Sequence, residues 1–102
     1  MKVVRAAAAT ADIDWAAEEL AVECGAHVAN LFLTRLDATA KFVATMPLAF
    51  SLVDPPLARH PGLRVVPVKR FTARLIFYTP TATGILVVRV LMASSDWQAI
   101  LE

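Results

Sequence analysis

Residues 85–97 read ILVVRVLMASSDW, and this stretch decides the fold. Its nearly unbroken apolar run predicts a strand over 85–92 that is buried on both faces and therefore lies in the middle of its sheet. Arg89 interrupts that run, and a charged side chain in a central strand is rarely left without a partner. Asp96, shortly after the strand, is the partner that we expect within the chain.

The serines after this strand explain why it ends abruptly. Ser94 or Ser95 predicts the N-cap of a short helix over 96–101, because a serine hydroxyl accepts a hydrogen bond from a free backbone N–H at the start of a helix. Trp97 falls at the beginning of that helix, where an aromatic ring is most simply a packing residue that closes the sheet.

Two further strands lead into the central one. Apolar and β-branched residues predict them over 63–68 and 72–79, and residues 80–84 supply the turn before the central strand. Pro67 places the first of these strands at an edge or gives it an irregular end, because proline has no N–H to donate. Alternation in the second strand puts Leu75 and Phe77 on one face and Arg74, Ile76 and Tyr78 on the other.

The N-terminal half predicts one short strand, over 2–8, followed by an antiparallel helical hairpin. Thr10 or Asp12 caps the first helix, and Gly25 separates it from a second helix over 26–45. The buried stripe of the first helix comprises Ile13, Ala16, Ala17, Leu20, Ala21 and Cys24. The stripe of the second comprises Val28, Phe32, Leu36, Thr39, Ala40 and Val43, and Leu31 and Leu33 widen it so that this helix packs on two neighbours.

A proline-rich segment joins the hairpin to the strands. Pro47 ends the second helix, because the residue before a proline avoids the helical region. Residues 47–61 contain four prolines and predict a surface loop, with a short ordered turn near 50–53. The predicted order is β-α-α-β-β-β-α, an α+β domain over 1–102 with the helical hairpin packed on a curved, mostly antiparallel sheet.

Composition limits the class of protein. With 102 residues, 58% hydrophobic and 19% charged, the chain is one folded domain, and no apolar run reaches the roughly 18 residues of a membrane span. Its basic, alanine-rich start faintly imitates a signal peptide, but Asp12 and Asp14 interrupt it, so we expect a cytoplasmic protein. The single cysteine, Cys24, excludes an internal disulfide, and its place on the helical stripe predicts a buried, inert thiol.

Charge is distributed unevenly along the chain. Residues 1–54 carry a net charge of −3 and residues 55–102 carry +4. The basic half suggests an acidic partner, either protein or nucleic acid, although protection of a sheet edge by charge is the simpler explanation for any single residue. The cations predicted to lie on the sheet, with one tyrosine among them, are Arg64, Lys69, Arg70, Arg74, Arg89 and Tyr78. Such side chains pair with carboxylates as readily as with phosphates.

Motifs for catalysis or cofactor binding are not evident. The glycines are too scattered for a phosphate-binding loop, and His27 and His60 match no metal-ligand spacing. Neither a nucleophile elbow nor a carboxylate pair for acid–base chemistry is present. We therefore expect no catalytic residue, no metal and no cofactor.

Four stretches carry a family resemblance. They read ADIDWAAEEL, ANLFLTRLDATAKFVATMP, GLRVVPVKRFTARLIFY and ILVVRVLMASSDW, and they cover nearly the whole chain. In this order and spacing the sequence resembles the ParE branch of the RelE/ParE superfamily, the toxins of bacterial type II toxin–antitoxin systems. The fold predicted above from periodicity is also the fold of that family.

The resemblance implies a plasmid-stabilisation toxin that poisons DNA gyrase and is neutralised by a cognate, ParD-like antitoxin in a hetero-oligomer. That antitoxin has a DNA-binding N-terminal part and a flexible C-terminal segment, which folds over the toxin and is anchored by apolar side chains of the hairpin and sheet. The toxin would then meet nucleic acid only indirectly, and no membrane is involved. The residues expected to bind the antitoxin or the target are Arg64, Lys69, Arg70, Arg74, Tyr78, Arg89 and Trp97.

Two positions depart from the family pattern. After Arg89-Val90-Leu91 the family usually has a histidine, where this chain has Met92, and it usually has an arginine where this chain has Ser95. The RelE branch cleaves messenger RNA on the ribosome with groups of this kind, so the departures favour the ParE mode, which needs a binding surface. Two alternatives stay open: a RelE-type ribosome-dependent endoribonuclease, and a non-toxic remnant that still binds its antitoxin.

Overall fold

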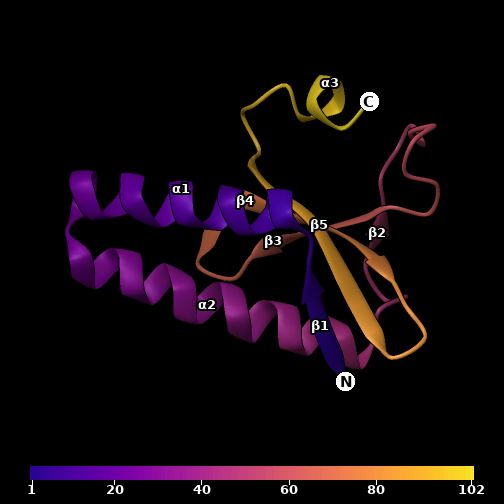
Figure 1. The fold of residues 1–102 in the computed structure, drawn as a ribbon, viewed down its shortest axis with the longest axis horizontal. Helices are drawn as coiled ribbons and strands as arrows, with labels where there is room; N and C mark the ends of the chain where they lie inside the picture. Colours follow the sequence, from indigo (N-terminus) through magenta and orange to yellow (C-terminus); the bar gives the residue numbers. More distant parts are fainter.

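A five-stranded mixed sheet forms the body of the computed structural model, which describes residues 1–102. The elements are β1 (Lys2–Arg5), α1 (Ala7–Cys24), α2 (Ala26–Thr45), β2 (Ser51–Leu52), β3 (Arg64–Val68), β4 (Phe71–Pro80), β5 (Gly84–Met92) and α3 (Trp97–Leu101). The strand order is β1-β5-β4-β3-β2, and only the β1–β5 pair is parallel. The α1–α2 hairpin packs on one face of the sheet and α3 contributes to the other (Figure 1). The predicted α+β class and the hairpin on a mostly antiparallel sheet are confirmed.

The strand β5 lies between β1 and β4, in the interior position that its apolar sequence predicts. All of its residues except the last are buried or half-buried. Its register with β4 shifts between Phe77 and Tyr78, which leaves Val88 of β5 without a partner. Because this bulge inserts one residue, Val87 and Val90 both contribute to the same core although an uninterrupted strand would turn them to opposite faces.

Two hydrophobic cores occupy the two faces of the sheet. The core beneath the hairpin includes Ile13, Ala16, Phe32, Leu36, Val43, Val68, Ile76, Tyr78 and Ile85. The smaller core on the opposite face comprises Val53, Leu57, Leu63, Phe77, Leu91 and Leu101. The predicted alternation of β4 is therefore confirmed, because Ile76 and Tyr78 join the first core and Phe77 joins the second.

The helix α1 begins earlier than the sequence predicts. The strand β1 ends at Arg5, the N–H of Ala6 still donates to the Val87 carbonyl at 2.9 Å, and the helix starts at the next residue. Thr10 and Asp12 therefore lie within α1, and the prediction that one of them caps it is wrong. Alanine has the highest helix propensity, so the alanines before Thr10 extend the helix back to the strand.

The hairpin turns at Gly25, as predicted, and its tip projects beyond the sheet (Figure 1). Gly25 has φ of 92° and donates its N–H to the Ala21 carbonyl at 3.0 Å, so this one residue ends α1 and begins α2. Side chains near the tip lie outside the sheet. Cys24 is exposed, and Leu31 and Leu33 are 38% and 37% exposed, so their predicted burial is wrong.

Two smaller corrections concern loops. The segment predicted as a loop over 47–61 contains β2, which pairs with the first two residues of β3. The cap of α3 is Asp96, whose carboxylate accepts a hydrogen bond from the Ala99 N–H at 3.5 Å, and not a serine. Ser95 donates instead to the Met92 carbonyl at 2.6 Å, in the turn that ends β5.

None of the three helices combines the length and the hydropathy that a membrane-spanning helix requires.

The contact between β1 and β5 yields a first prediction. A Cβ atom on Gly84 would overlap the backbone of Lys2, its partner in the parallel pair. We expect Gly84→Ala to lower the free energy of unfolding by about 3 kcal/mol, because backbone atoms must separate to admit the methyl group. Urea denaturation followed by circular dichroism measures this.

Gly62→Ala is the control. Gly62 has φ of 77° but open space around the added Cβ, so only the left-handed backbone conformation costs free energy, about 1 kcal/mol. Equal losses for the two variants would contradict the close approach at Gly84.

Candidate functional site

Arg89 is held by Asp12 of α1 and not by the predicted Asp96. The Nε of Arg89 donates to one carboxylate oxygen of Asp12 at 2.7 Å and its terminal nitrogen donates to the other at 2.9 Å. The N–H of Val90 donates to Asp12 as well, at 3.0 Å. The hydrogen bond to Asp12 raises the pKa of the Arg89 guanidinium, against a smaller opposing effect of burial. This bidentate pair therefore fastens α1 to the interior strand.

Arg74, on β4, is held by the same helix. Its terminal nitrogen contacts the Glu19 carboxylate at 2.9 Å, and the residue is only 9% exposed. Two of the cations predicted to bind a partner thus form ion pairs with acidic residues of α1. As the structure stands, their hydrogen-bonding capacity serves the packing of the hairpin on the sheet.

Arg64 and Tyr78 fix the segment that follows α2. Arg64 donates to the carbonyls of Leu48 and Phe50, at 3.2 and 2.5 Å, and Tyr78 donates its hydroxyl to the Pro47 carbonyl at 2.7 Å. The Tyr78 side chain is fully buried, and this burial raises the pKa of its hydroxyl, an effect that the positive charge of Arg64 opposes. Neither group projects freely from the sheet.

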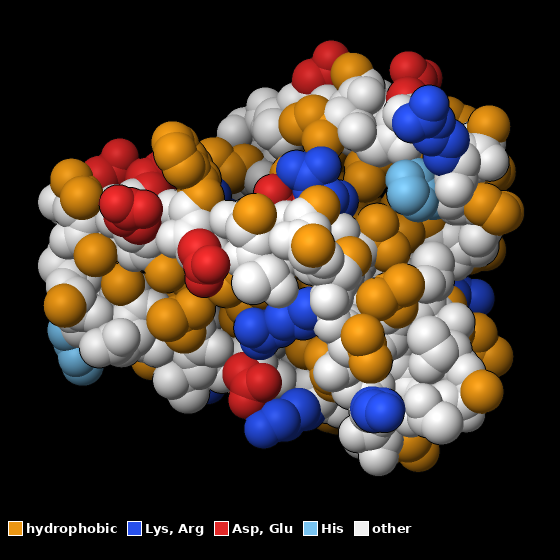
Figure 2. Space-filling model, in the orientation of Figure 1, with side chains coloured by type: hydrophobic (Ala, Val, Ile, Leu, Met, Phe, Trp, Pro, Cys, Tyr) orange, Lys and Arg blue, Asp and Glu red, His pale blue; other side chains and the backbone are white.

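Lys69 and Arg70 remain exposed in the turn between β3 and β4. Neither forms a side-chain ion pair or hydrogen bond, although the backbone N–H of Lys69 donates to the Thr39 hydroxyl of α2 at 3.2 Å. Arg70 has φ of 71°, in the left-handed region. On the face shown in Figure 2, Lys and Arg side chains occur as separate groups among hydrophobic ones and form no continuous basic patch.

The end of β5 carries the positions at which the family pattern has a histidine and an arginine. Met92 is 37% exposed and lies opposite Arg74 in the β4–β5 register. A hollow of about 180 Å³ opens here, and its charged lining residues are Asp12 and Arg74, both already in ion pairs. Trp97 lies further along the chain, half-buried, with its ring 5.2 Å from that of Phe77. Nowhere in the chain do three or more His, Cys, Asp or Glu side chains gather as metal ligands.

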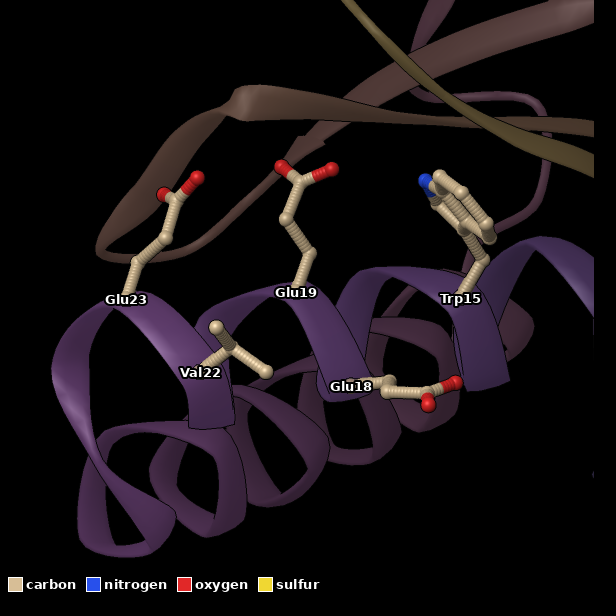
Figure 3. A pocket seen from close by; sticks show the side chains of 5 residues that line it. All are labelled: Trp15, Glu18, Glu19, Val22 and Glu23. Carbon is tan, nitrogen blue, oxygen red and sulfur yellow. The ribbon is translucent and has the colours of Figure 1, made fainter.

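A row of side chains on α1 forms a first open groove. Trp15, Glu19 and Glu23, spaced four residues apart, point to the same side of the helix, and Glu18 and Val22 lie beside them (Figure 3). Trp15 and Val22 are 69% and 83% exposed. This hollow of about 290 Å³ is acidic and carries two large apolar side chains.

A second and larger groove, of about 400 Å³, lies between α2 and β3. Phe42 and Phe50 are in its wall, with their rings 6.3 Å apart and nearly edge to face, and Phe42 is 55% exposed. Arg35 and Lys69 supply its charged lining. Of the seven residues predicted to bind a partner, only Lys69 lines this groove.

Sequence reasoning missed Arg35 and Trp15. Arg35 precedes Leu36 on the predicted stripe of the second helix, so its position next to a buried face was a usable signal. Trp15 falls between two stripe residues of the first helix, and a large aromatic off the apolar face is a second signal of that kind.

Comparisons with known proteins agree with this fold. The sequence matches a family model described as "ParE toxin of type II toxin-antitoxin system, parDE" over residues 3–97. The fold is similar to a solved structure described as "Chromosomal ParDE TA system from P. aeruginosa", with a TM-score of 0.70 and 16% sequence identity, over 90% of this chain and 95% of that chain. At this identity the likeness shows the fold alone. Comparison with curated proteins finds no match.

The Asp12–Arg89 pair yields a second prediction. The two side chains are 13% and 27% exposed, so Asp12→Ala leaves a mostly buried guanidinium and the Val90 N–H without their acceptor. We expect the free energy of unfolding to fall by about 3 kcal/mol, measured by urea denaturation.

The matched control is Asp37→Ala. Asp37 pairs with Lys41 at 2.9 Å on the surface, with side chains 49% and 70% exposed, and we expect a loss below about 1 kcal/mol. If the two alanine variants lose the same stability, the tie between α1 and β5 is not the determinant that its geometry indicates.

Tyr78 yields a third prediction, because it is the only tyrosine of the chain and its ionisation is read directly from absorbance at 295 nm. Burial raises the pKa of its hydroxyl, so we expect a titration midpoint above the usual 10.0 in the folded protein and a return towards that value in concentrated urea. The stability from this group is intact below pH 10 and declines as the pH rises above it, since the folded state retains the proton longer.

Tyr78→Phe is the control. It removes the absorbance change and leaves the Pro47 carbonyl without its donor, at a cost of about 1 kcal/mol. A folded-state midpoint at or below that of the unfolded chain would contradict the buried position of the hydroxyl.

Proposed function

Because this chain belongs to the ParE toxin family of type II toxin–antitoxin systems, we propose that it binds and poisons DNA gyrase and is neutralised by a ParD-like antitoxin. In this proposal the toxin acts in the cytoplasm, in a plasmid-stabilisation system, and traps gyrase on broken DNA. The antitoxin binds DNA through its N-terminal part and covers the toxin with a flexible C-terminal segment that folds on binding.

The side chains at the end of β5 favour a toxin that acts by binding over one that cleaves messenger RNA. Met92 and Ser95 offer no group that exchanges a proton near neutral pH, and the adjacent Arg74 and Asp12 are held in ion pairs. The hydroxyl of Tyr78 is buried and hydrogen-bonded to a carbonyl. Cleavage of RNA needs a group free to take or give a proton, whereas inhibition by binding needs an accessible surface.

The exposed apolar side chains support a partner that wraps the toxin. In an 11.0 kDa chain, Trp15, Val22, Phe42, Leu48 and Leu52 are each more than half exposed. Exposed apolar side chains that share one groove, as Trp15 and Val22 do on α1, are typical of an interaction site. Beside Phe42, the unpaired Arg35 and Lys69 favour an acidic segment of the partner, whereas Trp15 and Val22 lie among glutamates.

A DNA cleavage assay tests the target, and is the fourth prediction. Purified toxin is incubated with gyrase, ATP and supercoiled plasmid, and linear DNA is measured after detergent and protease treatment. We expect linear DNA to increase with the amount of toxin. A stoichiometric amount of the ParD-like antitoxin, to be sought as a small protein encoded next to this gene, should abolish the increase.

Two other outcomes would contradict the proposal. Cleavage of messenger RNA on programmed ribosomes, with gyrase unaffected, would identify a RelE-type endoribonuclease. Inactivity in both assays, with toxicity gained by the double substitution Met92→His and Ser95→Arg, would identify a non-toxic remnant that retains the fold.

A further inference from the structure

The groove between α2 and β3 combines an apolar wall with unpaired positive charge. Arg35, Thr39 and Phe42 line it from α2, Phe50 lines it from the following loop, and Lys69 lies at its end beyond β3. Its lining contains two cations and no carboxylate. A groove of this chemistry fits a ligand with both an apolar side chain and a negative charge.

Arg35 differs from the other arginines that pack against the body of the protein. Arg5, Arg74 and Arg89 each contact a carboxylate, and Arg64 donates to two carbonyls. The Nε of Arg35, by contrast, is shut off from solvent and reaches no acceptor in the chain. A buried donor without an acceptor lowers stability, and such donors are rare enough in folded proteins that each one calls for an explanation.

The missing hydrogen bond leaves the guanidinium of Arg35 without a polar partner in the chain. A carboxylate engages an arginine best through two adjacent nitrogens, as the Arg89–Asp12 pair shows with Nε and a terminal nitrogen. No polar contact within the chain fixes Arg35, so little is lost when its guanidinium turns towards an incoming carboxylate.

The outer edge of β3 leaves room for a polypeptide beside this groove. The strand β2 pairs only with Arg64 and Val65, so residues 66–68 have no strand neighbour on that side. Pro67 within this edge has no N–H to donate, so strand addition there would be incomplete. Side-chain contacts in the groove, more than backbone pairing, would therefore decide what binds.

We propose that this groove receives an acidic and apolar stretch of the antitoxin's flexible segment, with one carboxylate of that segment on Arg35. A further carboxylate or a backbone carbonyl of the same stretch lies near Lys69, and an apolar side chain packs against Phe42 and Phe50. The inference rests on the proposed function, because it locates the partner that the function requires. It assigns the recognition to Arg35, because Arg64, Arg74 and Arg89 already have partners within the chain and the Nε of Arg35 has none.

Affinity measurements test the groove, and are the fifth prediction. The probe is the ParD-like antitoxin used in the DNA cleavage assay, titrated calorimetrically into the purified toxin. We expect Arg35→Met to weaken binding about tenfold or more, because a charge-assisted bidentate contact is lost. Lys69→Met should weaken it less, and Arg35→Lys should restore part of the affinity, since lysine keeps the charge but not the fork of donors.

Arg59→Met is the matched control. Arg59 is an exposed cation in the proline-rich loop, without an ion pair and outside the groove lining, so the variant makes the same change of charge elsewhere. We expect its affinity to stay within about twofold of the unaltered toxin. Replacing the antitoxin's carboxylates by amides one at a time should reveal one whose effect disappears in the Arg35→Met background.

Stability separates a binding role of Arg35 from a structural one. Arg35→Met removes an unsatisfied donor and retains the aliphatic stem, so its midpoint of urea denaturation should be unchanged or higher while its affinity falls. A lower midpoint, or an affinity equal to that of the unaltered toxin, would overturn the inference and leave the proposed function intact. If the unaltered toxin forms no complex with that antitoxin, the proposed function itself fails.

Discussion

One carboxylate joins the two halves of this protein. Asp12 accepts hydrogen bonds from both Arg89 nitrogens and from the Val90 N–H, so a single side chain of α1 satisfies a buried charge and a backbone donor of β5. The two partners are 77 residues apart in the chain. Because β1 pairs with the same strand and leads into α1 through Ala6 alone, the sheet and the helix reach β5 together. The Asp12–Arg89 pair and the β1–β5 pairing together fix the position of the hairpin on the sheet. They therefore also fix the positions of the grooves that α1 and α2 border.

The cations of the chain divide into two groups with different consequences. Most of those on the strands have partners within the chain: Arg74 and Arg89 form ion pairs with α1, and Arg64 donates hydrogen bonds to the loop after α2. Arg35 and Lys69 have no such partners and meet in one groove. Positive net charge in the second half of the sequence therefore does not show how many cations are free to bind a partner, because a cation paired inside the molecule is not available outside it.

Sequence reasoning reached the fold because the fold depends on local patterns. The apolar run of β5, the alternation of β4 and the helix break at Gly25 are each visible within a few neighbouring residues. It failed where a distant residue decides. Asp96 was chosen for Arg89 because it was near in sequence, whereas Asp12 becomes its neighbour only through the β1–β5 pairing. Cys24 lies on the apolar stripe of α1 but is exposed. Whether the end of that stripe is buried depends on how far the sheet extends beneath it, and a local sequence pattern does not contain this information.

Paired and unpaired cations differ in how readily they can be substituted without loss of stability. Changing Arg74 or Arg89 leaves an acidic side chain of α1 without its partner, so the fold resists substitution there. Changing Arg35 or Lys69 breaks no contact of their charged groups within the chain. Under the proposal that the antitoxin binds at Arg35 and Lys69, its specificity can therefore vary while the sheet and hairpin stay constant. A toxin and an antitoxin that must recognise one another and ignore related pairs need a site of this kind, where charge and shape vary at little cost to stability.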